Sequence, residues 1–206
     1  MKYDPRLHHR RSIRLKGYDY TQPGAYFVTI CTHGRLEMFG EVVQGEMRLN
    51  EYGQIAAARW RWLADQYPYV RLDAWVIMPN HMHGILMIVG DDAAGRGGSR
   101  PAPTGMRPAP THPDTPKRKP LDQLIGAFKT VSAKHINQLR RSPGAHVWQR
   151  NYYEHIVRND RALNAIRHYI QNNPLNWQLD RDNPGNRRQM PPPVRVEDYL
   201  ADIELS

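Results

Sequence analysis

The chain has 206 residues, 40% of them hydrophobic, and a formal net charge of +9, which suits one domain with appendages and a polyanionic partner such as nucleic acid. No apolar run approaches the roughly 18 residues that a membrane-spanning helix needs, and the start of the chain lacks the apolar segment of a signal peptide. Cys31 is the single cysteine, which excludes an intrachain disulfide and a multi-cysteine zinc site, so we expect the reducing cytoplasm.

The first segment, residues 1–16, is a basic arm that contains Arg10, Arg11 and Arg14. It could lie on a phosphate backbone or be a solvated tail. The run 25–32 is rich in β-branched and aromatic residues and follows a Pro-Gly pair, which predicts a strand. Residues 41–49 predict a short hairpin.

A helix is predicted from Asn50, a good N-cap residue, until Pro68 stops it. Residues 71–89 then predict two consecutive strands. The pivot between them is at residues 78–80, because Pro79 cannot donate a hydrogen bond to a sheet ladder.

Residues 90–120 are dominated by Gly, Pro, Ala, Arg and Thr and cannot bury a core, so we expect a mobile insertion within one domain. Apolar residues at helical spacing predict a helix over 121–139. A strand is expected over 147–157, followed by a helix over 161–173 that Asp160 caps and Pro174 ends. Residues 178–206 are expected to be an irregular tail.

This order of elements fits an α+β sandwich, with helices packed on one face of a mainly antiparallel sheet. We therefore expect one catalytic domain over residues 17–177, interrupted by the insertion at 90–120. The second half has too few strands to stand alone as another domain.

A histidine pair stands at the start of the second of the two consecutive strands. His81 and His83 flank Met82, and residues two apart in a strand project to the same face. Two neutral imidazoles on a rigid strand are a natural two-ligand platform for a divalent ion. Surface or hydrogen-bonded core histidines are the competing interpretation, and a third ligand is still needed.

The last predicted helix carries a candidate nucleophile and a candidate ligand. Tyr169 and Asn173 are four positions apart and so share one face of that helix. A phenol and an amide oxygen would be presented together. The alternative is a core aromatic followed by a helix C-cap.

Two other tyrosines compete with Tyr169. Alternation along the strand sends one of Tyr152 and Tyr153 inward and the other outward, close to His155. Either could be a nucleophile or a platform on which bases stack, although core packing is the commoner role. No serine nucleophile elbow, phosphate-binding loop or paired-cysteine motif is present.

Several motifs in a fixed order resemble those of the single-tyrosine His-hydrophobic-His (HUH) transposases, and within them the REP-associated tyrosine transposases. The matching segments span most of the chain between Gly17 and Trp177; they are residues 24–29, 75–84, 128–130, 148–155 and 169–174.

The resemblance implies a ferredoxin-like sheet and a single-stranded or hairpin DNA substrate, such as a REP-like palindrome. It also implies that His81 and His83 bind Mg²⁺ or Mn²⁺ and that Tyr169 attacks the DNA to form a 5′-phosphotyrosine. Asn173 stands where relatives often carry Gln as the third ligand. The active form would be a monomer or a dimer that exchanges its last helix.

Basic side chains would contact the DNA backbone under this interpretation. They are Arg10, Arg11, Arg14, Lys129, Lys134, Arg140, Arg141 and Arg150. Two other functions stay open. One is a DNA-binding protein that keeps the fold with little or no cleavage. The other is a metal-dependent phosphodiester hydrolase in which His155 or Asp73 joins the histidine pair.

Overall fold

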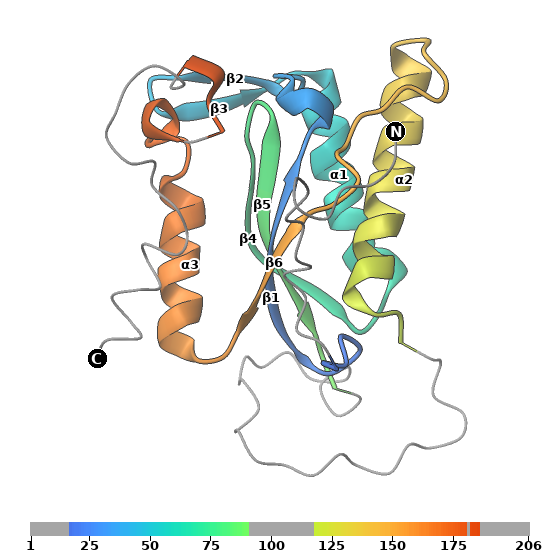
Figure 1. Ribbon diagram of the computed structural model, residues 1–206, viewed down its shortest axis with the longest axis vertical. Helices are drawn as coiled ribbons and strands as arrows, with labels where there is room; N and C mark the ends of the chain where they lie inside the picture. The colour runs from blue at the N-terminus through green and yellow to red at the C-terminus, as the bar shows by residue number, and fades with distance from the viewer. Residues whose placement is uncertain (1–16, 91–117, 181, 186–206) are drawn as a thin grey trace, which may run out of the picture.

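The computed structural model describes residues 17–90, 118–180 and 182–185 (Figure 1). The basic arm at 1–16, most of the predicted insertion and the chain from residue 186 onward lie outside the described residues. Within them, no helix is long and apolar enough to cross a membrane.

A four-stranded antiparallel sheet of order β4-β5-β1-β6 forms the centre of the molecule. Its strands are β1 (Gly24–Cys31), β4 (Val70–Ile77), β5 (His81–Ile88) and β6 (Tyr153–Val157). The helices are α1 (Glu51–Gln66), α2 (Leu121–Leu139) and α3 (Asp160–Asn172), with short 3₁₀ turns η1 (His33–Arg35) and η3 (Trp177–Leu179).

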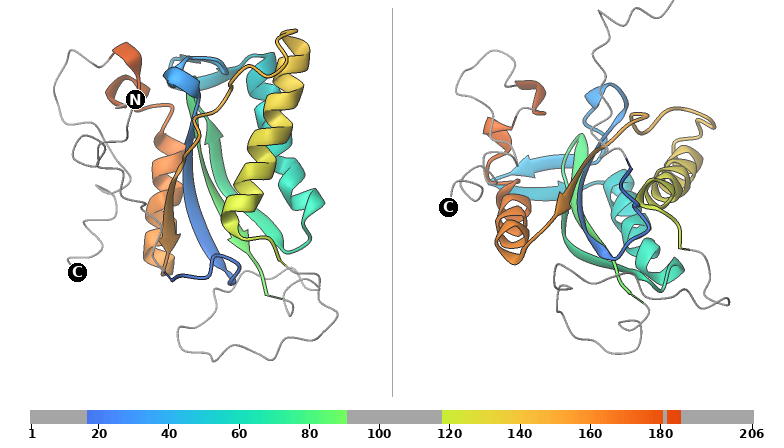
Figure 2. Two further views of the ribbon diagram at one scale, coloured as in Figure 1. Left: turned by 45° about the vertical axis from the view of Figure 1, so that its right-hand side comes forward. Right: turned by 60° about the horizontal axis from the view of Figure 1, so that its bottom comes forward.

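The succession β1-α1-β4-β5-α2-β6 is the βαββαβ arrangement of ferredoxin-like folds, as predicted. Two additions depart from this unit. The hairpin β2 (Gly40–Val43) and β3 (Glu46–Leu49) is inserted between β1 and α1 and lies at the end of the sheet where β5 begins (Figures 1 and 2). Helix α3 follows β6.

The helices cover both faces of the sheet, so the expectation of a single covered face holds for α1 and α2 but is wrong for α3 (Figure 1). Tyr26 and Val28 of β1 pack with α1 and α2, whereas Phe27 between them packs with α3. Strand β5 likewise sends Leu86 to the first face and Ile85 to the second. Strands that are apolar on both faces need a cover on both.

The predicted helix boundaries agree closely with the structure. Asn50 caps α1, because its Oδ1 accepts a hydrogen bond from the Gly53 N–H at 3.0 Å. Helix α2 covers the same residues as predicted. The cap of α3 is different: Asn159, and not Asp160, accepts from the Ala162 N–H at 2.8 Å. Asp160 is the first residue of the helix.

The predicted strand at 147–157 is shorter in the structure and begins at Tyr153. Trp148 forms only an isolated bridge with Thr32. The intervening carbonyls of residues 149–151 accept hydrogen bonds from the Lys129 ammonium at 3.0 to 3.3 Å. This lysine, which reaches over from α2, holds those residues as a loop before β6 begins.

Gly84 lies on the α1 side of β5, where a side chain would collide with the core. A Cβ atom there would come within 2.7 Å of Trp60 Cζ2, and the Trp60 side chain is fully buried. We expect Gly84→Ala to lower the free energy of unfolding by about 1–3 kcal/mol, because the indole cannot move without disturbing the core. Urea unfolding followed by circular dichroism measures this.

Gly126 in α2 gives the matched control. A Cβ atom at this position meets nothing within 4 Å. Gly126→Ala should therefore raise the free energy of unfolding by about 0.5–1 kcal/mol, since alanine is the better helix residue. An unchanged unfolding midpoint for Gly84→Ala would contradict the predicted collision.

Candidate active site

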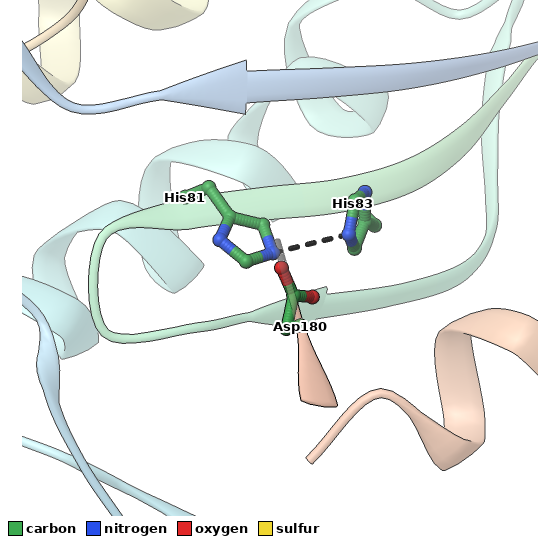
Figure 3. A group of neighbouring side chains, drawn as sticks. All are labelled: His81, His83 and Asp180. Atoms are coloured by element: carbon green, nitrogen blue, oxygen red, sulfur yellow. Dashed lines mark hydrogen bonds between the residues drawn. The ribbon is translucent and has the colours of Figure 1, made fainter. Parts of the chain in front are cut away.

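His81 and His83 lie at the start of β5 on the face that α3 covers. The register against β1 places them opposite Cys31 and Thr29, respectively. Both imidazoles are buried, and their Nε2 atoms lie 3.0 Å apart (Figure 3). Two nitrogen ligands at about 2.1 Å from one ion and at right angles are also roughly 3.0 Å apart. The pair therefore has the spacing of two ligands to a single metal.

The other ring nitrogens are held by polar partners. Asn80 donates its amide N–H to the Asp182 carbonyl at 2.6 Å, which leaves Asn80 Oδ1 to accept from His81 Nδ1 at 2.9 Å. Thr29 Oγ1 lies 2.8 Å from His83 Nδ1. If Thr29 donates, His83 Nε2 carries the proton and hydrogen-bonds to His81 Nε2; if Thr29 accepts, both Nε2 lone pairs are free to bind one cation.

Burial keeps these histidines uncharged at neutral pH. It lowers the pKa of His81 to about 4, against a smaller opposing effect of the nearby Asp180 carboxylate. Burial also lowers the pKa of His83 well below its ordinary value, and His81 adds to this shift. Neutral imidazole is the form that binds metals.

Asp180 adds a carboxylate to the histidine pair (Figure 3). Its candidate ligand oxygen and the two imidazole nitrogens all lie within 4.8 Å of one another. The residue directly follows η3 and is buried. Among the described residues, this is the group of three His, Cys, Asp or Glu side chains arranged to hold a metal ion.

Tyr169 and Asn173 of the last helix also reach the histidine pair. The Tyr169 hydroxyl lies 3.3 Å from His83 Nε2, in the same chain. Asn173 is 3% exposed, and its Oδ1 is buried without a hydrogen-bond donor. Asn173 lies beside His81 and favours the protonated imidazole, which raises the pKa of His81. Burial of His81 lowers that pKa by more. A buried amide oxygen next to the His81 imidazole fits a cation site.

Phe27 organises the aromatic packing beneath the site. Its ring stacks on His83 with centroids 5.6 Å apart and meets the edge of Tyr169 at 6.1 Å. Tyr153 packs against the same ring at 6.2 Å, one strand further from the histidines. Phe27 therefore fixes the orientation of Tyr169 relative to His83.

Helix α3 is fastened to β4 by one ion pair on the same face. Arg167 donates to the two carboxylate oxygens of Asp73 at 2.8 and 2.5 Å. The hydrogen bonds from Arg167 are the main cause that lowers the pKa of Asp73. Asp73 is thus committed to holding the helix, and neither it nor His155 belongs to the metal-ligand group in the described residues.

The predicted DNA contacts that the structure describes come from α2, its C-terminal end and the loop before β6. Lys134 lies on α2, and Arg140 and Arg141 directly follow that helix. Helix α2 covers the face of the sheet opposite to the histidines. Lys129 is engaged with carbonyls and lies over the Tyr152 ring at 5.2 Å. Arg150 is exposed, in the loop before β6. Arg10, Arg11 and Arg14 lie outside the described residues.

Sequence reasoning missed three polar residues of the site. Asp180 lies in the segment predicted to be an irregular tail, where no periodicity marks it. The sequence indicates only a turn at Asn80 and a strand at Thr29. A signal for Asn80 existed, because an amide next to a candidate metal-binding histidine is suited to orient the ring.

Comparisons with known proteins agree with the sequence motifs. A family profile described as "Transposase IS200 like" matches residues 113–173. An uncharacterized protein of Haemophilus influenzae is 38% identical over 179 residues, which cover 87% of this chain and 96% of that protein. A solved REP-associated tyrosine transposase bound to a REP hairpin has a similar fold, with a TM-score of 0.51 and 19% identity over 82% of this chain and 74% of that one.

The Asp73–Arg167 pair predicts a pH-dependent contribution to stability. Asp73→Asn should lower the free energy of unfolding at pH 7 by about 1 kcal/mol, a modest value because Arg167 is partly exposed and water screens the pair. The pKa of Asp73 lies below its ordinary 3.8, so the contribution is complete above that pH and is lost as the pH falls through the folded-state value.

Urea unfolding at several pH values tests this. The difference between the wild type and Asp73→Asn should stay constant from about pH 7 to pH 5 and narrow only below about pH 4. Asp65→Asn, at an exposed position of α1, serves as the control and should change stability by less than about 0.5 kcal/mol. A constant difference into acid would contradict the role of the charged pair.

Proposed function

We propose that this chain is an IS200-like transposase that cleaves and rejoins single-stranded or hairpin DNA through a 5′-phosphotyrosine on Tyr169. The observation that carries the proposal is the Tyr169 hydroxyl, 3.3 Å from His83 Nε2 beside a two-imidazole site. The REP hairpin bound by the structurally similar transposase supports a folded DNA strand as the substrate.

The residues that would hold a divalent ion, Mg²⁺ or Mn²⁺, are His81 and His83, with a third ligand from Asn173 as the family resemblance implies. When bound, the ion would polarise the scissile phosphate and neutralise the charge that develops during attack. Thr29 and Asn80 would keep the two imidazoles in the tautomers that offer Nε2 to it.

Tyr169 would attack phosphorus through its phenol oxygen. The new bond joins that oxygen to phosphorus, the bond from phosphorus to the 3′ oxygen breaks, and the proton lost by the phenol is balanced by the one gained by the 3′-hydroxyl. The ester keeps the energy of the broken phosphodiester, so a 3′-hydroxyl can reverse the step and reseal DNA.

A single chain would be sufficient for this chemistry. Tyr169 and the histidine pair come together within one chain, and Phe27 and the Asp73–Arg167 pair hold α3 in that position. Exchange of the last helix between two subunits is therefore not required to bring the nucleophile to the metal ligands. We accordingly favour a monomer for the cleavage step.

Tyr169→Phe should abolish a covalent adduct with labelled hairpin DNA in the presence of Mn²⁺, because the variant removes only the attacking oxygen. A denaturing gel detects the adduct, and a filter-binding assay should show unchanged DNA affinity. Tyr153→Phe is the matched comparison, since both rings pack on Phe27, and it should still form the adduct.

The alternatives give different results in the same assay. An adduct that survives Tyr169→Phe but disappears in Tyr153→Phe would assign the nucleophile to β6. DNA binding without an adduct from the wild-type protein would indicate a binding protein that has lost cleavage. Metal-dependent cleavage without an adduct would indicate a hydrolase.

A further inference from the structure

We infer that Asp180 supplies the charged metal ligand of this site and that the segment following α3 is built to deliver it. This inference rests on the proposed function for the role of the metal but not for its geometry. The carboxylate belongs to the same group of neighbouring ligand atoms as His81 and His83 (Figure 3). Two ligands at about 2.1 Å from one ion lie roughly 3–4 Å apart, so a side-chain adjustment on the order of an ångström would bring the three ligand atoms to a single ion.

The carboxylate is held in place by its own surroundings. The Asp182 N–H donates to Asp180 Oδ1 at 2.6 Å, and the Asn173 side-chain amide lies 3.5 Å from Asp180 Oδ2. Asn173 therefore contacts both the carboxylate and the region of His81, while its own Oδ1 has no donor. We assign Asn173 the additional role of positioning Asp180.

The segment that carries Asp180 is fastened to the far side of the site. Asn80 donates to the Asp182 carbonyl at 2.6 Å and to the Arg35 carbonyl at 3.3 Å. Arg35 forms an ion pair with the Asp182 carboxylate. Because Asn80 also orients His81, one amide ties the ligand-bearing segment to the first histidine. These contacts fix the segment in place, unlike the irregular tail that the sequence predicts from residue 178.

The chemistry of the ligand set favours a carboxylate. Mg²⁺ and Mn²⁺ are hard cations that prefer oxygen ligands, and a charged oxygen binds them more strongly than an amide. Two neutral imidazoles alone would leave the charge of the ion uncompensated in a buried site. One buried carboxylate reduces that charge and leaves coordination positions for phosphate oxygens.

The test is Mn²⁺ binding by the full chain without DNA, measured by calorimetry and by the loss of the free-ion signal in electron paramagnetic resonance. Asp180→Asn keeps the shape and removes the charge, and it should weaken binding by about 100-fold or more. Asp182→Asn makes the same change two positions away, in the same buried segment, and should weaken binding by less than about 10-fold, the lower range for an outer-shell residue.

Thermal unfolding gives a second readout that a purely structural carboxylate would not produce. Without metal, Asp180→Asn should unfold at the same temperature as the wild type or higher, because a buried charge beside neutral imidazoles has been removed. The rise in unfolding temperature on adding Mn²⁺ should be lost. Asp180→Glu should restore part of the Mn²⁺ binding.

Two results would overturn the inference: equal loss of Mn²⁺ affinity in Asp180→Asn and Asp182→Asn, or undiminished binding in Asp180→Asn. The first would mean that the segment only needs to be anchored. A separate result would contradict the proposed DNA chemistry: wild-type protein that binds Mn²⁺ but forms no tyrosine adduct. Measuring Mn²⁺ binding without DNA therefore separates failure of the Asp180 inference from failure of the proposed function.

Discussion

The antiparallel register between β1 and β5 is the constraint on which the candidate site depends. It sets Thr29 opposite His83 and directs both histidines toward α3. A slip of one residue would turn every β5 side chain to the other face, placing Met82 at the site and the imidazoles against α1 and α2. The apolar residues on both faces resist such a slip, because each has a tightly packed place in one of two cores.

Local patterns predicted most of the fold. Asn50, a good N-cap residue, predicted the start of α1, and the apolar spacing of residues 121–139 predicted the length of α2. Residue spacing on the strand and on the last helix made His81, His83, Tyr169 and Asn173 candidates, and only the family resemblance gave them roles in one site; the structure brings the four residues together. The elements and the candidate pairs needed only neighbours within about one turn or one strand, whereas the resemblance needed several motifs in order along the chain.

The remainder depended on contacts between distant segments. Asp180 meets the histidines because the chain turns back after α3 and pairs with Asn80 and Arg35, and no local pattern encodes that. For Lys129, which the family resemblance proposed as a DNA contact, the sequence did not indicate that three carbonyls of a distant loop accept its hydrogen bonds or that burial lowers its pKa to about 8. The same contacts explain why the strand at 147–157 was predicted too long.

The position after the histidine pair shows that a sequence motif can combine two unrelated requirements. His83 faces α3 and lies in the candidate site, while Gly84 faces α1 and leaves room for the Trp60 indole. The proposed activity and the folding of the core would therefore constrain adjacent positions of the sequence. In a mutational screen scored by activity alone, loss at residue 84 would look like loss of a catalytic group, although the affected core lies across the sheet from the candidate site.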